Sequence, residues 1–207
     1  MNRFLMAVGS LALATGCTTA EAPGDGPVAP MADPSSPLAA PTYLQMAASS
    51  DLFEIQSGQM AAQMSQNTAV RNFGNLLVAH HTHTTAQLVA AAQAAGLTPP
   101  PPALMPEHQA MLDQLRNAGP NFDVAFRDIQ VQAHQSALAL HQNYANGGDQ
   151  PALRNVAAAA VPIIQQHLTA AQALNVMPAA APMTTPAGEP APATSGEPAP
   201  ATSGERG

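Results

Sequence analysis

The chain has 207 residues, with 6 basic residues, all of them Arg, against 13 acidic ones, and its formal net charge at pH 7 is -7. Aromatic residues make up only 3% and Trp is absent. This composition excludes a basic surface for nucleic acid or anionic lipid, and the single Cys excludes an internal disulfide framework.

An apolar run near the N-terminus is typical of an export signal. It covers residues 4–14 and follows Arg3. The run is well short of the roughly 20 apolar residues that a membrane-spanning helix needs. We therefore expect residues 1–16 to be a signal peptide.

The end of this segment, Ala14-Thr-Gly-Cys17, is similar to the lipobox of bacterial lipoproteins, although Ala14 stands where Leu is usual. We expect lipidation of Cys17, which would anchor the chain in a membrane on the periplasmic side; ordinary cleavage that leaves a free thiol is the alternative. Thr18 and Thr19 stand where an inner-membrane retention signal would carry Asp, so the outer membrane is favoured.

Both ends of the mature chain are rich in Pro and small residues. Residues 17–40 contain five Pro without apolar periodicity and are predicted to be a disordered tether from Cys17. Residues 178–207 contain the octapeptide Gly-Glu-Pro-Ala-Pro-Ala-Thr-Ser twice, beginning at Gly188 and Gly196, and are predicted to be a disordered tail. One folded domain, residues 41–177, remains between them.

Four segments of this domain show helical periodicity and nearly equal length. They cover about residues 42–65, 68–95, 121–145 and 151–176. Two residues separate the first pair and five separate the second, which predicts two antiparallel hairpins. Residues 96–120 hold four consecutive Pro and a short helical pattern over about 104–117, long enough for a crossover along a bundle. We predict an all-α, ferritin-like four-helix bundle with one long crossover and a short extra helix.

A polar, metal-capable residue lies near the middle of each long helical segment: Glu54, His81, His134 and His167. Helix midpoints coincide in a bundle whichever way the neighbours run, so these side chains are expected in one or two layers. Three imidazoles and a carboxylate suit one transition-metal ion, either Zn, Fe, Mn or Cu. The competing interpretation is a metal-free hydrogen-bond network in which Glu54 accepts from the imidazoles.

A second possible metal site is a surface cluster of His and Met residues. His80 and His83, predicted to face solvent, could form a surface copper clip with Met60 and Met64, although methionines at this spacing are more often packing residues.

Two more residues lie near the polar layer. His141 lies one heptad beyond His134 on the same helical face and is expected to be either a second-layer partner or a rim residue. Pro162 is expected to kink the last helix.

Nothing in the residue pattern indicates an enzyme. The paired Glu-x-x-His motif of di-iron bundles is absent, and no nucleophilic triad or glycine-rich phosphate loop is found. No catalytic or organic-cofactor-binding residue is assigned.

Several short motifs together resemble a known bacterial family. They are Asp51-Leu-Phe-Glu-Ile-Gln-Ser-Gly58, Val78-Ala-His-His-Thr82, Ala133-His134, and the segment from Leu153 to Leu174 that contains Pro162 and His167. Over about residues 41–174 the chain resembles the ferritin-like family named domain of unknown function 4142. The resemblance implies an exported four-helix bundle with no established activity, and it places Glu54, His81, His134 and His167 on recurring polar positions of the family. The usual Asp before the second-helix His is here His80.

The expected function is a non-catalytic binding, structural or stress-related role in the cell envelope. The alternative is a mononuclear metal-handling or redox protein. An envelope protein partner or a homo-oligomer, formed through the Ala-rich outer faces, is a third expectation.

Overall fold

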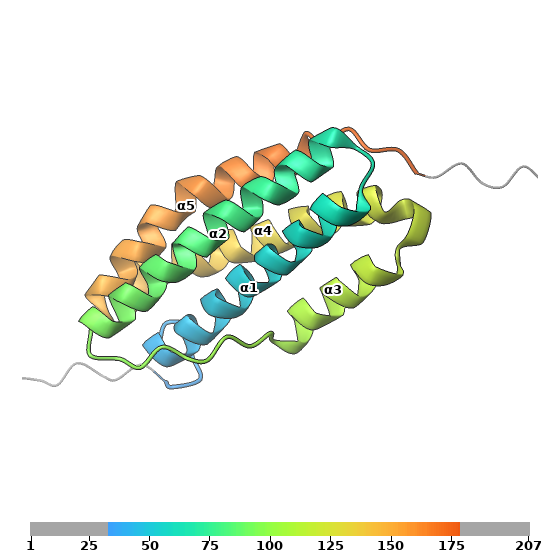
Figure 1. The fold of residues 1–207 in the computed structure, drawn as a ribbon. Coiled ribbons are helices and arrows are strands. Elements are labelled where there is room, and N and C mark those ends of the chain that lie inside the picture. The colour runs from blue at the N-terminus through green and yellow to red at the C-terminus, as the bar shows by residue number, and fades with distance from the viewer. Residues whose placement is uncertain (1–32, 179–207) are drawn as a thin grey trace, which may run out of the picture.

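The computed structural model describes residues 33–178, which form five α-helices and one short 3-10 helix, with no strand among them (Figure 1). The helices are α1 (Ala40–Met64), α2 (Thr68–Ala94), α3 (Pro106–Asn117), α4 (Phe122–Gly147) and α5 (Pro151–Gln172), with η1 (Gly119–Asn121) before α4. The all-α prediction is confirmed. The predicted signal peptide, Cys17, most of the tether and the repeats of the tail lie outside the described residues.

Local sequence signals mark the helix starts. Pro41, Pro106 and Pro151 occupy the first turn of α1, α3 and α5, where a missing backbone N–H leaves no intrahelical bond unmade. Asn67 caps α2, because its side chain accepts a hydrogen bond from the Ala69 N–H at 2.9 Å. α5 continues through Pro162 but ends at Gln172, four residues before the predicted end.

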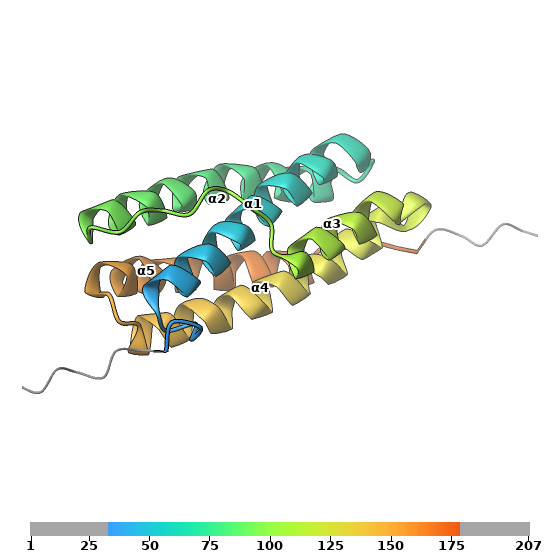
Figure 2. The same cartoon turned by 90° about the horizontal axis from the view of Figure 1, so that it is seen from below.

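The four long helices lie side by side along one axis (Figures 1 and 2). α1 packs on α2 and α4 on α5, and the two pairs meet where α2 contacts α5 and α1 contacts α4. α3 lies outside this group against α1 and α4, and it buries Leu112 and Leu115 completely. No helix of residues 33–178 is long and apolar enough to cross a membrane.

The close approach of α1 and α2 depends on two facing glycines. A Cβ atom on Gly58 would lie 2.6 Å from the Gly74 carbonyl oxygen, and one on Gly74 would lie 2.6 Å from the Gly58 carbonyl oxygen. Real Cβ atoms do not approach a backbone oxygen so closely, so the hairpin needs glycine at both positions.

The buried apolar residues form two clusters at opposite ends of the bundle. One contains Phe53, Phe73 and Phe126 with the buried leucines of α3, and the other contains Tyr43, Tyr144 and Leu153. The rings of Tyr43 and Tyr144 stack with centroids 3.7 Å apart. A polar layer lies between the clusters, near the middle of the long helices.

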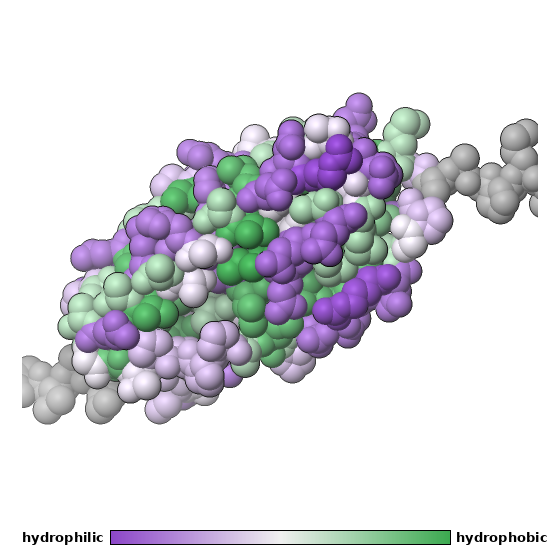
Figure 3. All heavy atoms as spheres, viewed as in Figure 1, coloured by the Kyte–Doolittle hydropathy of each residue, from purple (hydrophilic) through white to green (hydrophobic). Residues whose placement is uncertain are grey.

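The surface seen in Figure 3 carries mostly hydrophilic side chains, with apolar ones gathered near its centre. An apolar groove of about 200 Å³ runs where the proline segment of the crossover passes α1 and α2, with Leu52 and Pro100 among its walls. The crossover therefore covers part of the first hairpin.

Candidate metal centre

Three histidines from three helices meet in the middle of the bundle. His81 of α2, His134 of α4 and His167 of α5 each offer a ring nitrogen, and these atoms all lie within 4.8 Å of one another. Their side chains are shielded from solvent, with residue exposures of 7%, 1% and 2%. Nitrogens around a tetrahedral zinc ion stand about 3.4 Å apart, given metal–nitrogen distances of roughly 2.0–2.1 Å. The limit of 4.8 Å is wider than this spacing, so a bound metal would draw the three rings together.

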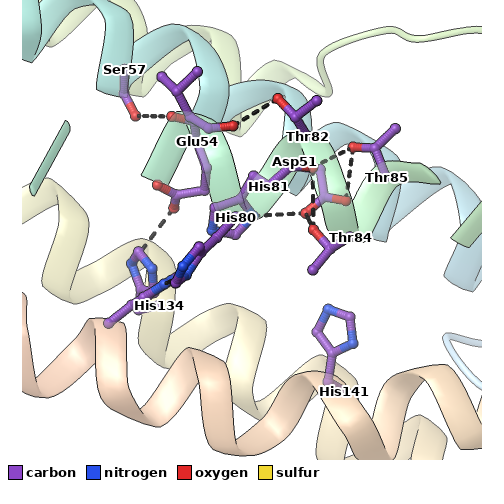
Figure 4. A network of polar contacts seen from close by, with 12 residues as sticks. Asp51, Glu54, Ser57, His80, His81, Thr82, Thr84, Thr85, His134 and His141 are labelled. Carbon is purple, nitrogen blue, oxygen red and sulfur yellow. Dashed lines mark hydrogen bonds and ion pairs between the residues drawn. The ribbon is translucent and has the colours of Figure 1, made fainter. Parts of the chain in front are cut away.

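Asp51 of α1 fixes the orientation of His81. Its Oδ1 lies 2.7 Å from His81 Nδ1, and the hydroxyls of Thr84 and Thr85 donate to its two oxygens at 2.9 and 3.0 Å (Figure 4). A carboxylate accepts hydrogen bonds, so the proton sits on His81 Nδ1. Nε2 of His81 is then the nitrogen with a free lone pair. A carboxylate behind an imidazole is the usual support of a metal-binding histidine.

His134 is held in the same way by the backbone. Its Nδ1 donates to the carbonyl oxygen of Gln130 at 2.9 Å, one helical turn earlier. A carbonyl can only accept, so His134 also presents Nε2 without a proton when the ring is neutral. Glu54 Oε1 lies 3.6 Å from the same Nδ1, which is an electrostatic contact but too long for a hydrogen bond.

His167 is bound through its other edge. Its Nε2 lies 2.8 Å from His80 Nδ1, and the two rings stack with centroids 5.0 Å apart. His80 is partly buried, so the prediction that it faces solvent is wrong, whereas His83 is exposed as predicted. The reason is that α5 packs against α2 and covers the face that carries His80.

Each of these three imidazoles therefore has one bonded nitrogen and one buried nitrogen without a hydrogen-bond partner. The unpartnered atoms are His81 Nε2, His134 Nε2 and His167 Nδ1. The two other unpartnered buried side-chain polar atoms among residues 33–178 are Glu54 Oε2 and Gln130 Oε1. All five belong to this layer. An unsatisfied buried polar atom costs about 1–3 kcal/mol, so their concentration in one place needs a reason.

The charges of the layer are unbalanced without a cation. Glu54 is 1% exposed and Asp51 9%, and neither forms an ion pair with Arg within residues 33–178. Burial lowers the pKa of His81, but the hydrogen bond that His81 donates to Asp51 and the charges of Glu54 and Asp51 outweigh it, so this pKa lies above its usual value. Burial, together with the neighbouring histidines His81, His134 and His80, lowers the pKa of His167 to about 3. The layer thus favours a positive charge beside His81, which a cation bound at Nε2 would supply in place of a proton, and a neutral imidazole at His167.

A cavity of about 30 Å³ lies among these side chains. Its walls include all four predicted residues, Glu54, His81, His134 and His167, together with Asp51, His80 and His141. The space exceeds what one water molecule or one ion requires. The structure thus brings the four predicted side chains around one small space. Glu54 is not part of the group of ligand atoms that lie within 4.8 Å of one another, which comes from the three imidazoles alone.

His141 is a second-layer residue rather than a rim residue. Its Nδ1 and the Tyr43 hydroxyl oxygen form a hydrogen bond of 3.0 Å, and burial lowers its pKa to about 4, a shift that Asp51 opposes and His81 reinforces. Met60 of the predicted surface clip packs against the apolar cluster that contains Phe53, while Met64 is exposed.

Sequence reasoning missed two residues of this layer, Asp51 and His80. Asp51 precedes Glu54 by three residues, which places both carboxylates on neighbouring positions of one helical face. That spacing was the available signal. The involvement of His80 had no comparable signal, because it depends on which face α5 covers.

No curated protein matches this chain. A solved structure titled "CopM in the Cu(II)-bound form" is similar in fold, with 16% sequence identity, a TM-score of 0.55, and coverage of 65% of this chain and 93% of that chain. The family model "Domain of unknown function (DUF4142)" matches residues 26–174, which is more than half of the chain and contains every residue of the polar layer. The chain therefore belongs to the DUF4142 family.

Proposed function

We propose that this protein is a non-catalytic metal-binding protein that holds one transition-metal ion in the middle of its helical bundle. His81, His134 and His167 supply the ligand nitrogens, and Glu54 supplies a carboxylate at or beside the metal. The observation that carries the proposal is the set of three buried nitrogens without partners, each on an imidazole whose other nitrogen is already bonded.

A closed hydrogen-bond network explains the layer less well. In such a network Glu54 would accept hydrogen bonds from the imidazoles, yet its nearest imidazole nitrogen is 3.6 Å away and its Oε2 has no partner. A divalent cation would bond the free nitrogens and balance the charges of Glu54 and Asp51 at the same time.

The donor set indicates the class of metal. Imidazole nitrogen suits zinc, copper, iron and nickel, whereas magnesium and calcium require mostly oxygen ligands. The similar solved structure contains Cu(II). Because its identity to this chain is only 16%, it supports the fold and makes copper the first metal to test.

The test is metal analysis of the full chain after loading with Cu(II) or Zn(II) and dialysis. We expect about one ion per chain, lost in the double variant His81→Ala, His167→Ala. His83→Ala is the matched control, because His83 lies two residues from His81 on an exposed position. Equal metal content in all three proteins, or no metal in any, would overturn the proposal.

We also propose that the bundle has ferritin-like connectivity and that lipidated Cys17 anchors it at the periplasmic face of the cell envelope, in the outer membrane. The order of two hairpins with a crossover that contains α3 supports the first part, and the lipobox-like sequence at Cys17 supports the second. Labelled palmitate in wild type but not in Cys17→Ser, followed by membrane fractionation, tests the anchor. Palmitate on the Cys17→Ser variant would refute it.

A further inference from the structure

A second cavity, separate from the histidine layer, has walls rich in sulfur. It lies between α1, α3 and α4 and has a volume of about 140 Å³. Met46 of α1, Met105 just before α3, and His108 and Met111 of α3 line it, and all four side chains are partly buried. Half of the six methionines in residues 33–178 therefore surround one small space.

The imidazole of His108 is held in place on two sides. Its Nδ1 lies 2.6 Å from the hydroxyl oxygen of Ser49, which also accepts the Met105 N–H at 2.8 Å. Its ring stacks on Phe53, with centroids 5.4 Å apart and planes inclined by 19°. In the tautomer with its proton on Nδ1, His108 donates to Ser49 and presents Nε2 as the ligand atom, the arrangement that supports metal-binding histidines.

The chemistry of this set differs from that of the bundle core. Thioether sulfur is an uncharged, polarisable donor that selects soft ions such as Cu(I), whereas Zn(II) and Cu(II) favour imidazole and carboxylate. Burial lowers the pKa of His108, against the opposing charges of Glu107 and Glu54, so its ring is neutral and able to bind a metal at pH 7. Glu107 also lines the cavity and supplies one negative charge opposite a monovalent cation.

We propose that Met46, Met105, Met111 and His108 form a second metal site, selective for a soft monovalent ion, Cu(I) or its analogue Ag(I). This site goes beyond the proposed core site, and neither depends on the other. The two cavities are neighbours, because Ser50 and Ala137 form part of the wall of both. A soft-metal site beside a histidine site would place two oxidation states of one metal in adjacent positions.

The test uses Ag(I) alone as probe on the full chain, with methionine methyl groups labelled with ¹³C and followed by NMR. One equivalent of Ag(I) is expected to shift the methyl signals of Met46, Met105 and Met111. The signals of Met60 and Met64 serve as internal controls, because both residues lie on the same helix as Met46 but outside the cavity. Their signals should stay in place. Zn(II) should shift none of the five.

Substitution provides a second readout. The double variant Met46→Leu, Met111→Leu should lose one bound Ag(I) per chain, while Met60→Leu, Met64→Leu should keep it. Ser49→Ala should weaken Ag(I) binding by roughly 10–100-fold, because it removes the hydrogen bond that orients His108. The His81→Ala, His167→Ala protein should keep the Ag(I) equivalent, which separates this site from the core site.

Three outcomes would overturn the proposal: unchanged methyl signals of Met46, Met105 and Met111, equal shifts of all methionines, or equal Ag(I) loss in both leucine pairs. In each case the three methionines are packing residues only. None of these results bears on Cu(II) or Zn(II) binding in the histidine layer.

Discussion

The ends of the bundle and its middle are built on opposite principles. At both ends, aromatic and aliphatic side chains pack into apolar clusters. In the middle, the same four helices bury two carboxylates and three imidazoles and leave five polar atoms without partners. The apolar packing at the ends stabilises the fold. The buried polar groups in the middle destabilise it unless a ligand or another polar group binds them. This contrast is the strongest reason to read the polar layer as a binding site.

The largest expected effect is at an apolar end. Phe126→Ala removes a fully buried ring that lies 6.2 Å from the ring of Phe73, so it should cost about 3–5 kcal/mol of unfolding free energy. Urea unfolding of the metal-free protein measures this loss. The metal content of the folded variant should not change, because the ring is outside the polar layer. A variant that lost its metal while still folded would show that the two regions are not separate.

Acid should weaken the middle of the metal-free protein. The pKa of His141 is about 4 in the fold, against roughly 6.5 in an unfolded chain. As pH falls below about 6.5, His141 becomes protonated in the unfolded chain while it stays neutral in the folded protein. The free energy of unfolding therefore falls by up to about 3 kcal/mol as pH drops from about 6.5 to 4. Above about pH 6.5 this loss does not occur.

The matched variant is His141→Gln, whose side-chain amide can either donate to or accept from the Tyr43 hydroxyl. It should flatten the curve of unfolding free energy against pH over this window. The raised pKa of His81 acts in the opposite sense, with stability present below about pH 6.5 and lost as pH rises through its folded pKa; it is common to variant and wild type apart from the coupling between His81 and His141. Identical slopes for the two proteins would contradict the assignment.

The next effect concerns the contact between α1 and α2. Gly58→Ala places a methyl group against the Gly74 carbonyl oxygen and should cost about 1–3 kcal/mol, because backbone must move to admit it. Gly147→Ala is the control, since its methyl group would meet only Leu38, at an ordinary 3.5 Å. The control should be neutral or stabilising by up to about 1 kcal/mol. Thermal unfolding of both variants distinguishes steric conflict from the general effect of losing a glycine.

The smallest effect on the unfolding free energy is expected for a substitution at His167. A structural hydrogen-bond network would predict a large effect there. His167→Leu in the metal-free protein should change the unfolding free energy by no more than about 1 kcal/mol, since loss of the hydrogen bond with the partly buried His80 is offset by removal of one unsatisfied buried nitrogen and by added apolar surface. The same variant should lose the stabilisation by metal, which is about 2.7 kcal/mol at a free metal concentration 100 times the Kd. A loss of 3 kcal/mol or more without metal would instead favour a structural network.

Much of this architecture could be predicted from residue patterns. The periodic segments at 68–95 and 121–145 agree with α2 and α4 to within two residues, because each has a continuous apolar stripe. Glu54, His81, His134 and His167 were expected near one level and do line one cavity. Asp51 was not recognised, because its three-residue spacing to Glu54 does not by itself show whether the carboxylate faces a histidine or solvent. His108 was passed over for a similar reason, since it lies in the crossover, where no periodicity indicates which helix it will meet.

The sequence by itself determined the all-helical class and the levels of the polar residues along the helices, since both follow from the 3.6-residue period and from segment length. Only the tertiary structure decided which nitrogen of each imidazole is bonded and which is left free, that His80 supports His167, and that three methionines share a cavity with His108. These features depend on the rotation of each helix about its own axis and on the path of the crossover. Both are set by packing between segments far apart in the chain.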